Sequence, residues 1–153
     1  MSNRLDHNIA APTGMKALGH LYGYVAQSGL SPVLLDLVYL RVSQINGCAY
    51  CIDMHSHDLM AKQMPIAKLL LVPAWREGGA MFDANERAAL AWAETVTRVA
   101  DTGVPDAEYA AASAVFPPQA LANLTLAIGM MNTYNRMAIS FRATPVSVAK
   151  LPA

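Results

Sequence analysis

Residues 46–55 contain a helix-ending signal, both cysteines of the chain and a histidine, and they constrain the fold more than any other stretch. Asn46-Gly47 is typical of a helix C-terminus, because glycine readily adopts the left-handed conformation that ends many helices. Cys48 and Cys51 are then expected in the first turn of the following helix. The pattern therefore predicts two helices joined by a tight turn, which can pack as an antiparallel hairpin.

The two cysteines are three residues apart, so on a helix they lie on the same side and can close a disulfide. A helix N-terminus and a nearby imidazolium both favour the reactive thiolate. His55 is four residues beyond Cys51, one turn along the same face, which puts a general base beside a thiol. Spacing alone leaves the attacking residue open, since Cys48 is nearer the helix terminus and Cys51 is nearer His55.

Asp36 is the candidate partner of His55. If residues 32–46 are helical, Asp36 lies roughly 15 Å back from the Asn-Gly turn at about 1.5 Å per residue. In an antiparallel hairpin His55 returns to about 10 Å from the same turn. We expect the two side chains to meet directly or through one water, with Asp36 orienting and charge-stabilising His55 in a relay to Cys51.

Apolar residues recur at helical spacing along the whole chain, and no strand pattern or internal repeat is present. We predict one all-α domain over residues 1–153, in which Asp83-x-x-Glu86 caps a helix. The segment 118–141 is apolar on nearly every side and is expected to be buried on several faces. The predicted helices span residues 12–28, 32–46, 48–63, 65 to about 73, 83–100, 105–115 and 118–141, with a loose arm at 1–11 and a loop at 75–81.

Charged residues make up only 14% of the chain, against a typical share of about 25%. Little charge is therefore available to cover a small monomer, and we expect a large subunit interface. The 11 basic and 11 acidic residues cancel without a basic cluster, which argues against nucleic acid or an anionic membrane as a partner.

The first twenty residues lack the apolar core of a secretory signal, and no apolar run reaches the roughly 18 residues of a membrane span. The expected compartment is the reducing cytoplasm. A Cys-x-x-Cys pair there more often serves redox or metal chemistry than structure.

An acidic residue, eleven intervening positions and Cys-x-x-Cys-x-x-x-His, at residues 36–55, resemble the core motif of the AhpD-like alkylhydroperoxidases in the carboxymuconolactone decarboxylase superfamily. Segments 40–48, 86–94 and 132–136 are also similar to small single-domain members of that family. The resemblance implies an AhpD-like domain of about six helices with the Cys-x-x-Cys at the N-terminus of a central helix. It also implies assembly as trimers or hexamers.

By the same resemblance, the chain is expected to reduce hydroperoxides without a bound cofactor. Cys51 would attack the peroxide, Cys48 would resolve, His55 and Asp36 would form the relay, and an external dithiol would restore both thiols. Two positions differ from the family: it has Glu where this chain has Asp36, and its best-studied form has His where this chain has Tyr50. The second difference removes one possible proton carrier.

Three alternatives remain at this point. A disulfide reductase or peroxide-responsive sensor would use the same dithiol, whereas a γ-carboxymuconolactone decarboxylase is ranked lower because such relatives do not rely on the cysteine pair. A zinc site is the third. On one helix His57 lies about 180° from Cys48, so a site built on Cys48, Cys51 and His55 would need a further ligand. The candidates for that ligand are Asp36, His20 and His7.

The other polar residues near the motif are given no role. His57 and Asp58 are expected on a solvated helix face. Tyr50 either lines a pocket or simply packs.

Overall fold

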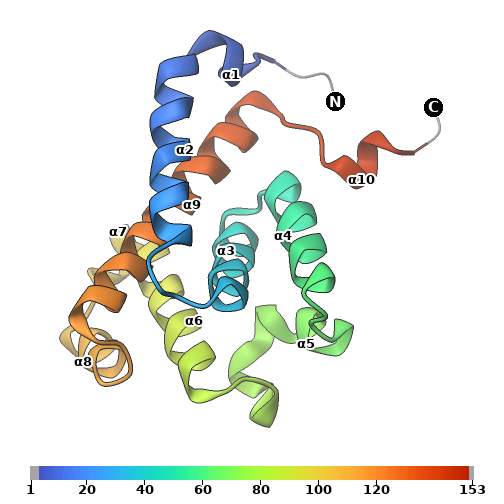
Figure 1. Ribbon diagram of the computed structural model, residues 1–153. Helices are drawn as coiled ribbons and strands as arrows, with labels where there is room; N and C mark the ends of the chain where they lie inside the picture. Colours follow the sequence, from blue (N-terminus) through green and yellow to red (C-terminus); the bar gives the residue numbers. More distant parts are fainter. Residues whose placement is uncertain (1–3, 152–153) are drawn as a thin grey trace.

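A computed structural model describes residues 4–151 of the chain, and this part contains helices and turns but no β-strand (Figure 1). The predicted all-α single-domain fold is confirmed. The α-helices and the two 3₁₀ elements are α1 (His7–Ala10), α2 (Pro12–Ala26), α3 (Pro32–Asn46), α4 (Ala49–Ala61), α5 (Ile66–Leu71), η1 (Val72–Glu77), η2 (Gly79–Met81), α6 (Ala84–Thr97), α7 (Val99–Thr102), α8 (Asp106–Ser113), α9 (Pro118–Phe141) and α10 (Val146–Ala149).

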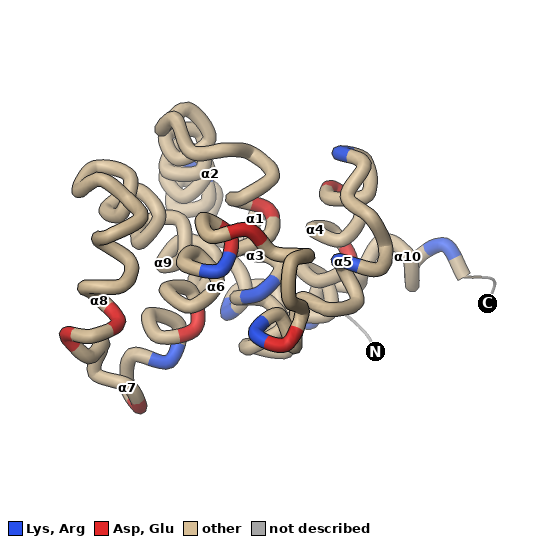
Figure 2. Tube along the Cα trace, turned by 90° about the horizontal axis from the view of Figure 1, so that it is seen from below, with Lys and Arg blue, Asp and Glu red and all other residues tan. Residues whose placement is uncertain are grey.

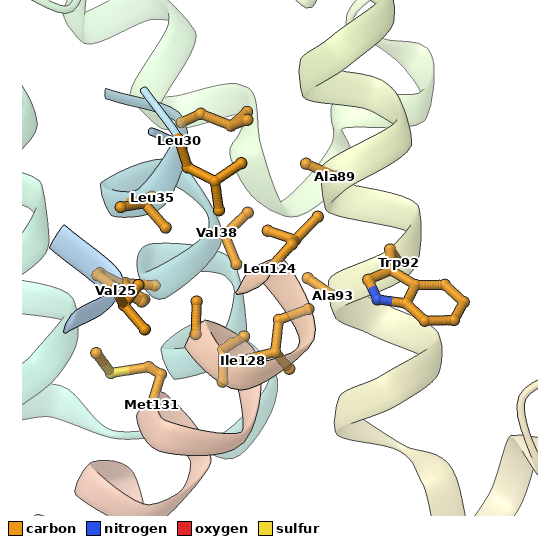
Figure 3. Close-up of a cluster of buried hydrophobic side chains, with 14 of the residues drawn as sticks. Val25, Leu30, Leu35, Val38, Ala89, Trp92, Ala93, Leu124, Ile128 and Met131 are labelled. Carbon is orange, nitrogen blue, oxygen red and sulfur yellow. The ribbon is translucent and has the colours of Figure 1, made fainter. Parts of the chain in front are cut away.

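Helix α3 lies at the centre and packs against α4, α6 and α9. One side of α3, with Leu35 and Val38, joins a core cluster built with α2, α6, α8 and α9, part of which is drawn in Figure 3. The other side, with Leu37 and Leu40, joins a second cluster with α4, η1 and α6. Burial on both sides explains why α3 is apolar around most of its circumference.

The connection from α3 to α4 consists of Gly47 and Cys48 alone. Gly47 has φ 70° and ψ 31°, and its N–H and that of Cys48 bond back to the last turn of α3. Cys48 is the N-cap of α4, and its sulfur accepts the N–H of Cys51 at 3.3 Å. The predicted turn and the predicted start of the cysteine helix are both confirmed.

Buried polar groups fix the other helices around α3. The predicted cap of α6 is confirmed as a reciprocal box, since the backbone N–H groups of Glu86 and Asp83 each donate to the other's carboxylate at 2.9 Å. Further along α6, the buried carboxylate of Glu94 accepts from Arg41 on α3 at 2.8 Å and from Trp75 on η1 at 2.9 Å. These bonds hold α3, η1 and α6 in register.

Some short elements differ from the prediction. The expected loose arm contains a single helical turn, α1, because the Asp6 carboxylate accepts the N–H groups of Asn8 and Ile9. Residues 1–3 of that arm lie outside the described residues. The expected loop at 75–81 is organised as η1 and η2, and α10 was not predicted.

Charge is sparse and mixed in sign over the described residues (Figure 2). The long helices α2 and α9 carry one basic residue each, Lys16 and Arg136, and no acidic residue. No single described helix has the length and apolarity of a membrane span. One pair of segments, 106–113 and 118–149, meets those criteria together by length and composition alone, but it is bent by 119°.

The left-handed turn at Gly47 predicts opposite effects for two Gly→Ala substitutions. A methyl group at Gly47 would meet no atom within 4 Å, so Gly47→Ala should cost only the backbone strain, about 1–2 kcal/mol of unfolding free energy. The control Gly19→Ala, at an equally open position inside α2, should stabilise by about 0.5–1 kcal/mol. Urea unfolding followed by circular dichroism measures both. A neutral Gly47→Ala would contradict the assigned turn.

Candidate active site

Cys48 and Cys51 form a disulfide across the first turn of α4, with their Cα atoms 5.4 Å apart. Both residues are buried, at 1% and 2% exposed, and they pack against Ala138 of α9. The two sulfurs therefore lie where the sequence placed them, and the described structure corresponds to the oxidised form of the pair.

A pocket of about 590 Å³ lies beside the disulfide, between α1, α2, α4 and α9. Cys51 is among its lining residues and Cys48 is not. Tyr50 also lines the pocket, which settles the position that the sequence left open. The apolar and aromatic part of the lining consists of Leu5, Met15, Tyr22, Tyr50, Met54, Met131, Tyr134, Ala138, Phe141 and Ala143.

His55 lines the same pocket and is only 1% exposed. Its ring packs against that of Tyr39 with 5.2 Å between centroids, and among the described residues no group hydrogen-bonds to either ring nitrogen. Burial lowers the pKa of His55, and the nearby carboxylates of Asp36 and Asp58 oppose this only in part. The imidazole is therefore neutral near pH 7, the form in which it can accept a proton.

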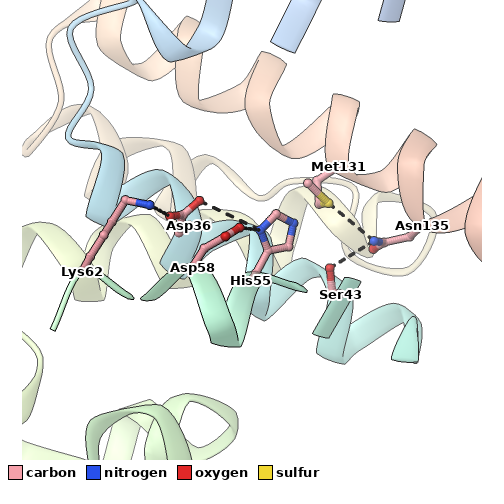
Figure 4. Close-up of polar contacts among 7 residues, drawn as sticks. All are labelled: Asp36, Ser43, His55, Asp58, Lys62, Met131 and Asn135. Atoms are coloured by element: carbon pink, nitrogen blue, oxygen red, sulfur yellow. Dashed lines mark hydrogen bonds and ion pairs between the residues drawn. The ribbon is translucent and has the colours of Figure 1, made fainter. Parts of the chain in front are cut away.

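Two carboxylates approach the same nitrogen of His55 (Figure 4). Asp36 Oδ1 lies 3.9 Å from His55 Nδ1, and Asp58 Oδ2 lies 3.6 Å from it. Both distances exceed a hydrogen bond but permit a charge interaction. The other oxygen of Asp36 accepts a hydrogen bond from Lys62 Nζ at 2.6 Å.

The predicted meeting of Asp36 and His55 is therefore present, but Asp58 and Lys62 were missed. Asp58 was expected on a solvated face, whereas its carboxylate points to His55 while its side chain stays 47% exposed. Helical spacing carried a signal for this, because Asp58 is three residues beyond His55. Lys62 had no such signal, because its partner Asp36 is 26 residues away.

Asp36, His55 and Asp58 each offer an oxygen or nitrogen atom within 4.8 Å of the others, an arrangement that suits a metal ion. The Lys62 ammonium already supplies a positive charge to this cluster through Asp36, which disfavours a second cation. His57 is turned elsewhere, toward Ser147 at 3.1 Å and Asp53 at 3.5 Å. His20 is exposed, and His7 lies in the pocket stacked on Phe141.

A buried amide network ties α9 to the end of α3, next to the cysteine turn. Asn135 is fully buried, and its amide donates to Ser43 Oγ at 3.0 Å. Asn46 donates to Asn132 at 3.0 Å and to Asn135 at 2.9 Å. These bonds position α9, and with it one wall of the pocket, relative to the disulfide.

Comparison with known proteins identifies the family. The model of the carboxymuconolactone decarboxylase family matches residues 12–95. The uncharacterized protein YdfG of Bacillus subtilis is 33% identical over 140 residues, covering 92% of this chain and 95% of that protein. The uncharacterized protein YnjA of Escherichia coli is 32% identical over 126 residues, covering 82% of this chain and 68% of that protein.

Solved structures agree with this assignment. A protein of unknown function from Agrobacterium tumefaciens, described as a candidate antioxidant defence protein AhpD, has a TM-score of 0.90 at 37% identity, over 94% of this chain and 98% of that one. An uncharacterized peroxidase-related protein from Silicibacter shares the fold at a TM-score of 0.72 and 21% identity, over 88% and 72% of the two chains. The chain therefore belongs to the carboxymuconolactone decarboxylase family, as one of its AhpD-like members.

Proposed function

We propose that this protein is a thiol-dependent peroxidase that reduces hydrogen peroxide or organic hydroperoxides by cycling Cys48 and Cys51 between dithiol and disulfide. One observation carries the proposal. A cysteine pair that can close within one helical turn lies at an apolar pocket beside a buried, neutral histidine. The description of the Agrobacterium protein points to the same chemistry.

The cycle has three steps. The Cys51 thiolate attacks one peroxide oxygen, the O–O bond breaks, Cys51 becomes a sulfenic acid and the other oxygen leaves as an alcohol or as water after protonation. The Cys48 thiol then attacks that sulfur, forming the disulfide and releasing water. An external dithiol reduces the disulfide by exchange and is itself oxidised to a disulfide. No bound cofactor enters these steps, and the reducing cytoplasm would supply the dithiol.

The assignment of Cys51 as the attacking residue is supported by access. Cys51 borders the pocket through which a peroxide can arrive, whereas Cys48, the N-cap of α4, is not among the lining residues. His55 follows Cys51 by one turn and is proposed to take the thiol proton. Asp36 is proposed to support the charged imidazole from α3, where its carboxylate lies 3.9 Å from His55.

The pocket also bears on the decarboxylase alternative. The described lining includes the carboxylates of Asp6 and Asp58 and contains neither Lys nor Arg. A γ-carboxymuconolactone carries carboxylate groups, which would find no cationic partner there. A neutral hydroperoxide meets no such obstacle.

The first test follows thiol loss after one equivalent of cumene hydroperoxide is added to fully reduced protein. We expect the wild type to form the internal disulfide rapidly, because Cys48 and Cys51 are already within bonding reach. Cys48→Ser should stop at the sulfenic acid, and Cys51→Ser should not react. Mass spectrometry of quenched samples distinguishes these products.

The matched variants also separate the alternatives. If all three proteins react no faster than free cysteine, the peroxidase proposal fails and a disulfide reductase is favoured. A disulfide that forms slowly but changes the affinity of a partner protein would instead indicate a redox sensor.

The acidic lining predicts selection by charge. We expect kcat/KM for cumene hydroperoxide to exceed that for its para-carboxylate derivative by at least about tenfold, because a bound carboxylate would lie near Asp58 in a poorly solvated pocket. Asp58→Asn should narrow this ratio, whatever it does to the two rates individually. Equal rates for both peroxides in the wild type would contradict the proposed binding mode.

We also propose that the chain self-associates, as its low charge suggests. Ile66 and Leu70 on α5 are 64% and 73% exposed, and Ile9 on α1 is 80% exposed. Sedimentation velocity should detect trimers or hexamers of the wild type. The variant Ile66→Glu/Leu70→Glu should shift this distribution toward monomer if α5 contributes to the interface, whereas Tyr109→Glu on α8 is the control for an exposed apolar position elsewhere. A monomeric wild type would contradict the proposal.

A further inference from the structure

Cys51, His55 and Asp58 form one row on α4, at spacings of four and three residues, and all three line the pocket. Asp36 approaches His55 from α3 and is not among the lining residues. The two carboxylates therefore reach the same Nδ1 atom from different helices, and only Asp58 does so from the pocket. This difference matters for which of them supports His55 when it takes a proton.

Asp36 is already engaged by another charge. Its Oδ2 atom accepts a hydrogen bond from Lys62 at 2.6 Å, and this bond raises the pKa of Lys62, so the ammonium stays charged. The Asp36 side chain is also only 8% exposed. Asp36 and Lys62 thus form a net-neutral ion pair, in which the ammonium offsets part of the effect of the Asp36 carboxylate on His55.

Asp58 is less engaged than Asp36. In the described structure its carboxylate lies 3.6 Å from His55, and it acts on Lys62 and Tyr22 through charge alone, without a hydrogen bond to either. The side chain is 47% exposed, so it has room to rotate and close the remaining distance to a charge-assisted hydrogen bond. Its negative charge is also not paired at short range with the Lys62 ammonium, which bonds to Asp36 instead.

We propose that Asp58 is the positioning residue of this site. It accepts the Nδ1–H of His55, which fixes the tautomer in which Nε2 is free to receive a proton. When the proton moves from Cys51 to Nε2, the thiolate and the imidazolium form together and Asp58 stabilises the imidazolium. The Asp36–Lys62 pair holds the ring from the α3 side. This inference rests on the proposed roles of Cys51 and His55.

The other titratable groups around His55 do not replace Asp58. Burial raises the pKa values of the neighbouring tyrosines, so these phenols stay neutral across the working pH range. Asp6 and His7 line the pocket from the α1 end, and in the described structure neither forms an ion pair or a ring contact with His55. The titratable groups that contact His55, act on its charge or share its pocket are Asp36 and Tyr39 on α3, Tyr50, Cys51 and Asp58 on α4, Lys62 after α4, Tyr22 on α2, Tyr134 on α9, and Asp6 and His7 at α1.

The test measures thiol reactivity rather than turnover. Reduced protein carrying Cys48→Ser is alkylated with iodoacetamide from pH 5 to pH 10, so that only Cys51 reports. We expect Asp58→Asn to slow alkylation at pH 7 by about tenfold, typical for losing support of a general base, and to match the parent above pH 9, where the thiol ionises unaided. Asp58→Glu should recover most of the rate. A general distortion would instead lower the rate at every pH.

Two control variants separate Asp58 from the other carboxylates. Asp36→Asn/Lys62→Met removes the neutral pair without changing the net charge and should slow alkylation at pH 7 less than Asp58→Asn does. Asp53→Asn removes a carboxylate elsewhere on α4, where it contacts Ser147. This variant should also slow alkylation at pH 7 less than Asp58→Asn does. NMR titration of His55 should show a lower pKa in Asp58→Asn than in the parent, because a negative charge has been removed.

The proposal is overturned if Asp58→Asn leaves both the alkylation profile and the His55 titration unchanged. It is also overturned if the Asp36→Asn/Lys62→Met variant has the larger effect, which would return the role to Asp36. Neither readout requires peroxide turnover. If the protein fails to reduce peroxide but shows the expected alkylation and titration profiles, the proposed peroxidase function is wrong. The role of Asp58 in activating Cys51 would still stand.

Discussion

The left-handed turn at Gly47 is the constraint on which the rest of the site depends. Because only Gly47 and Cys48 separate α3 from α4, the chain reverses at once and the two helices pack along their lengths. The same turn makes Cys48 the N-cap of α4 and points Cys51 to the pocket. It also brings Asp36 and His55, which are nineteen positions apart in the sequence, to within 3.9 Å. A longer, flexible loop between α3 and α4 would not fix the N-cap role of Cys48, the position of Cys51 at the pocket or the approach of Asp36 to His55.

Packing α4 against α3 and α9 has a cost as well as a benefit. It removes water from His55, and loss of hydration disfavours the imidazolium that proton transfer must create. In the proposed cycle, His55 therefore needs support from neighbouring charges to hold a proton in this pocket. The carboxylates of Asp36 and Asp58 offset part of this cost, and the Lys62 ammonium in turn makes the buried Asp36 charge tolerable.

How far the sequence predicts this structure depends on whether a signal is local. Gly47, the Asp83–Glu86 box and the long apolar segment 118–141 act through neighbouring backbone atoms or helical periodicity, so the elements they define are predicted almost to their ends. The contact of Lys62 with Asp36 depends on how α4 leans against α3, which no short stretch encodes. Asp58 is an intermediate case. Helical spacing predicts its side of α4, but nothing local reveals that α2 and α9 enclose that side as a pocket.

The different surroundings of the two cysteines suit different steps of the proposed cycle. Cys51 lines the pocket, where the proposed cycle requires both the peroxide and the external dithiol to reach it. A pocket of about 590 Å³ offers room for either reactant, as a narrow channel would not. Cys48 meets the N-terminus of α4, where its sulfur accepts the Cys51 N–H and the helix dipole favours a thiolate. A stabilised thiolate is a better leaving group when the dithiol attacks Cys51. Because the pair spans a single turn with Cα atoms 5.4 Å apart, opening and closing the disulfide requires side-chain rotation but no unwinding of α4.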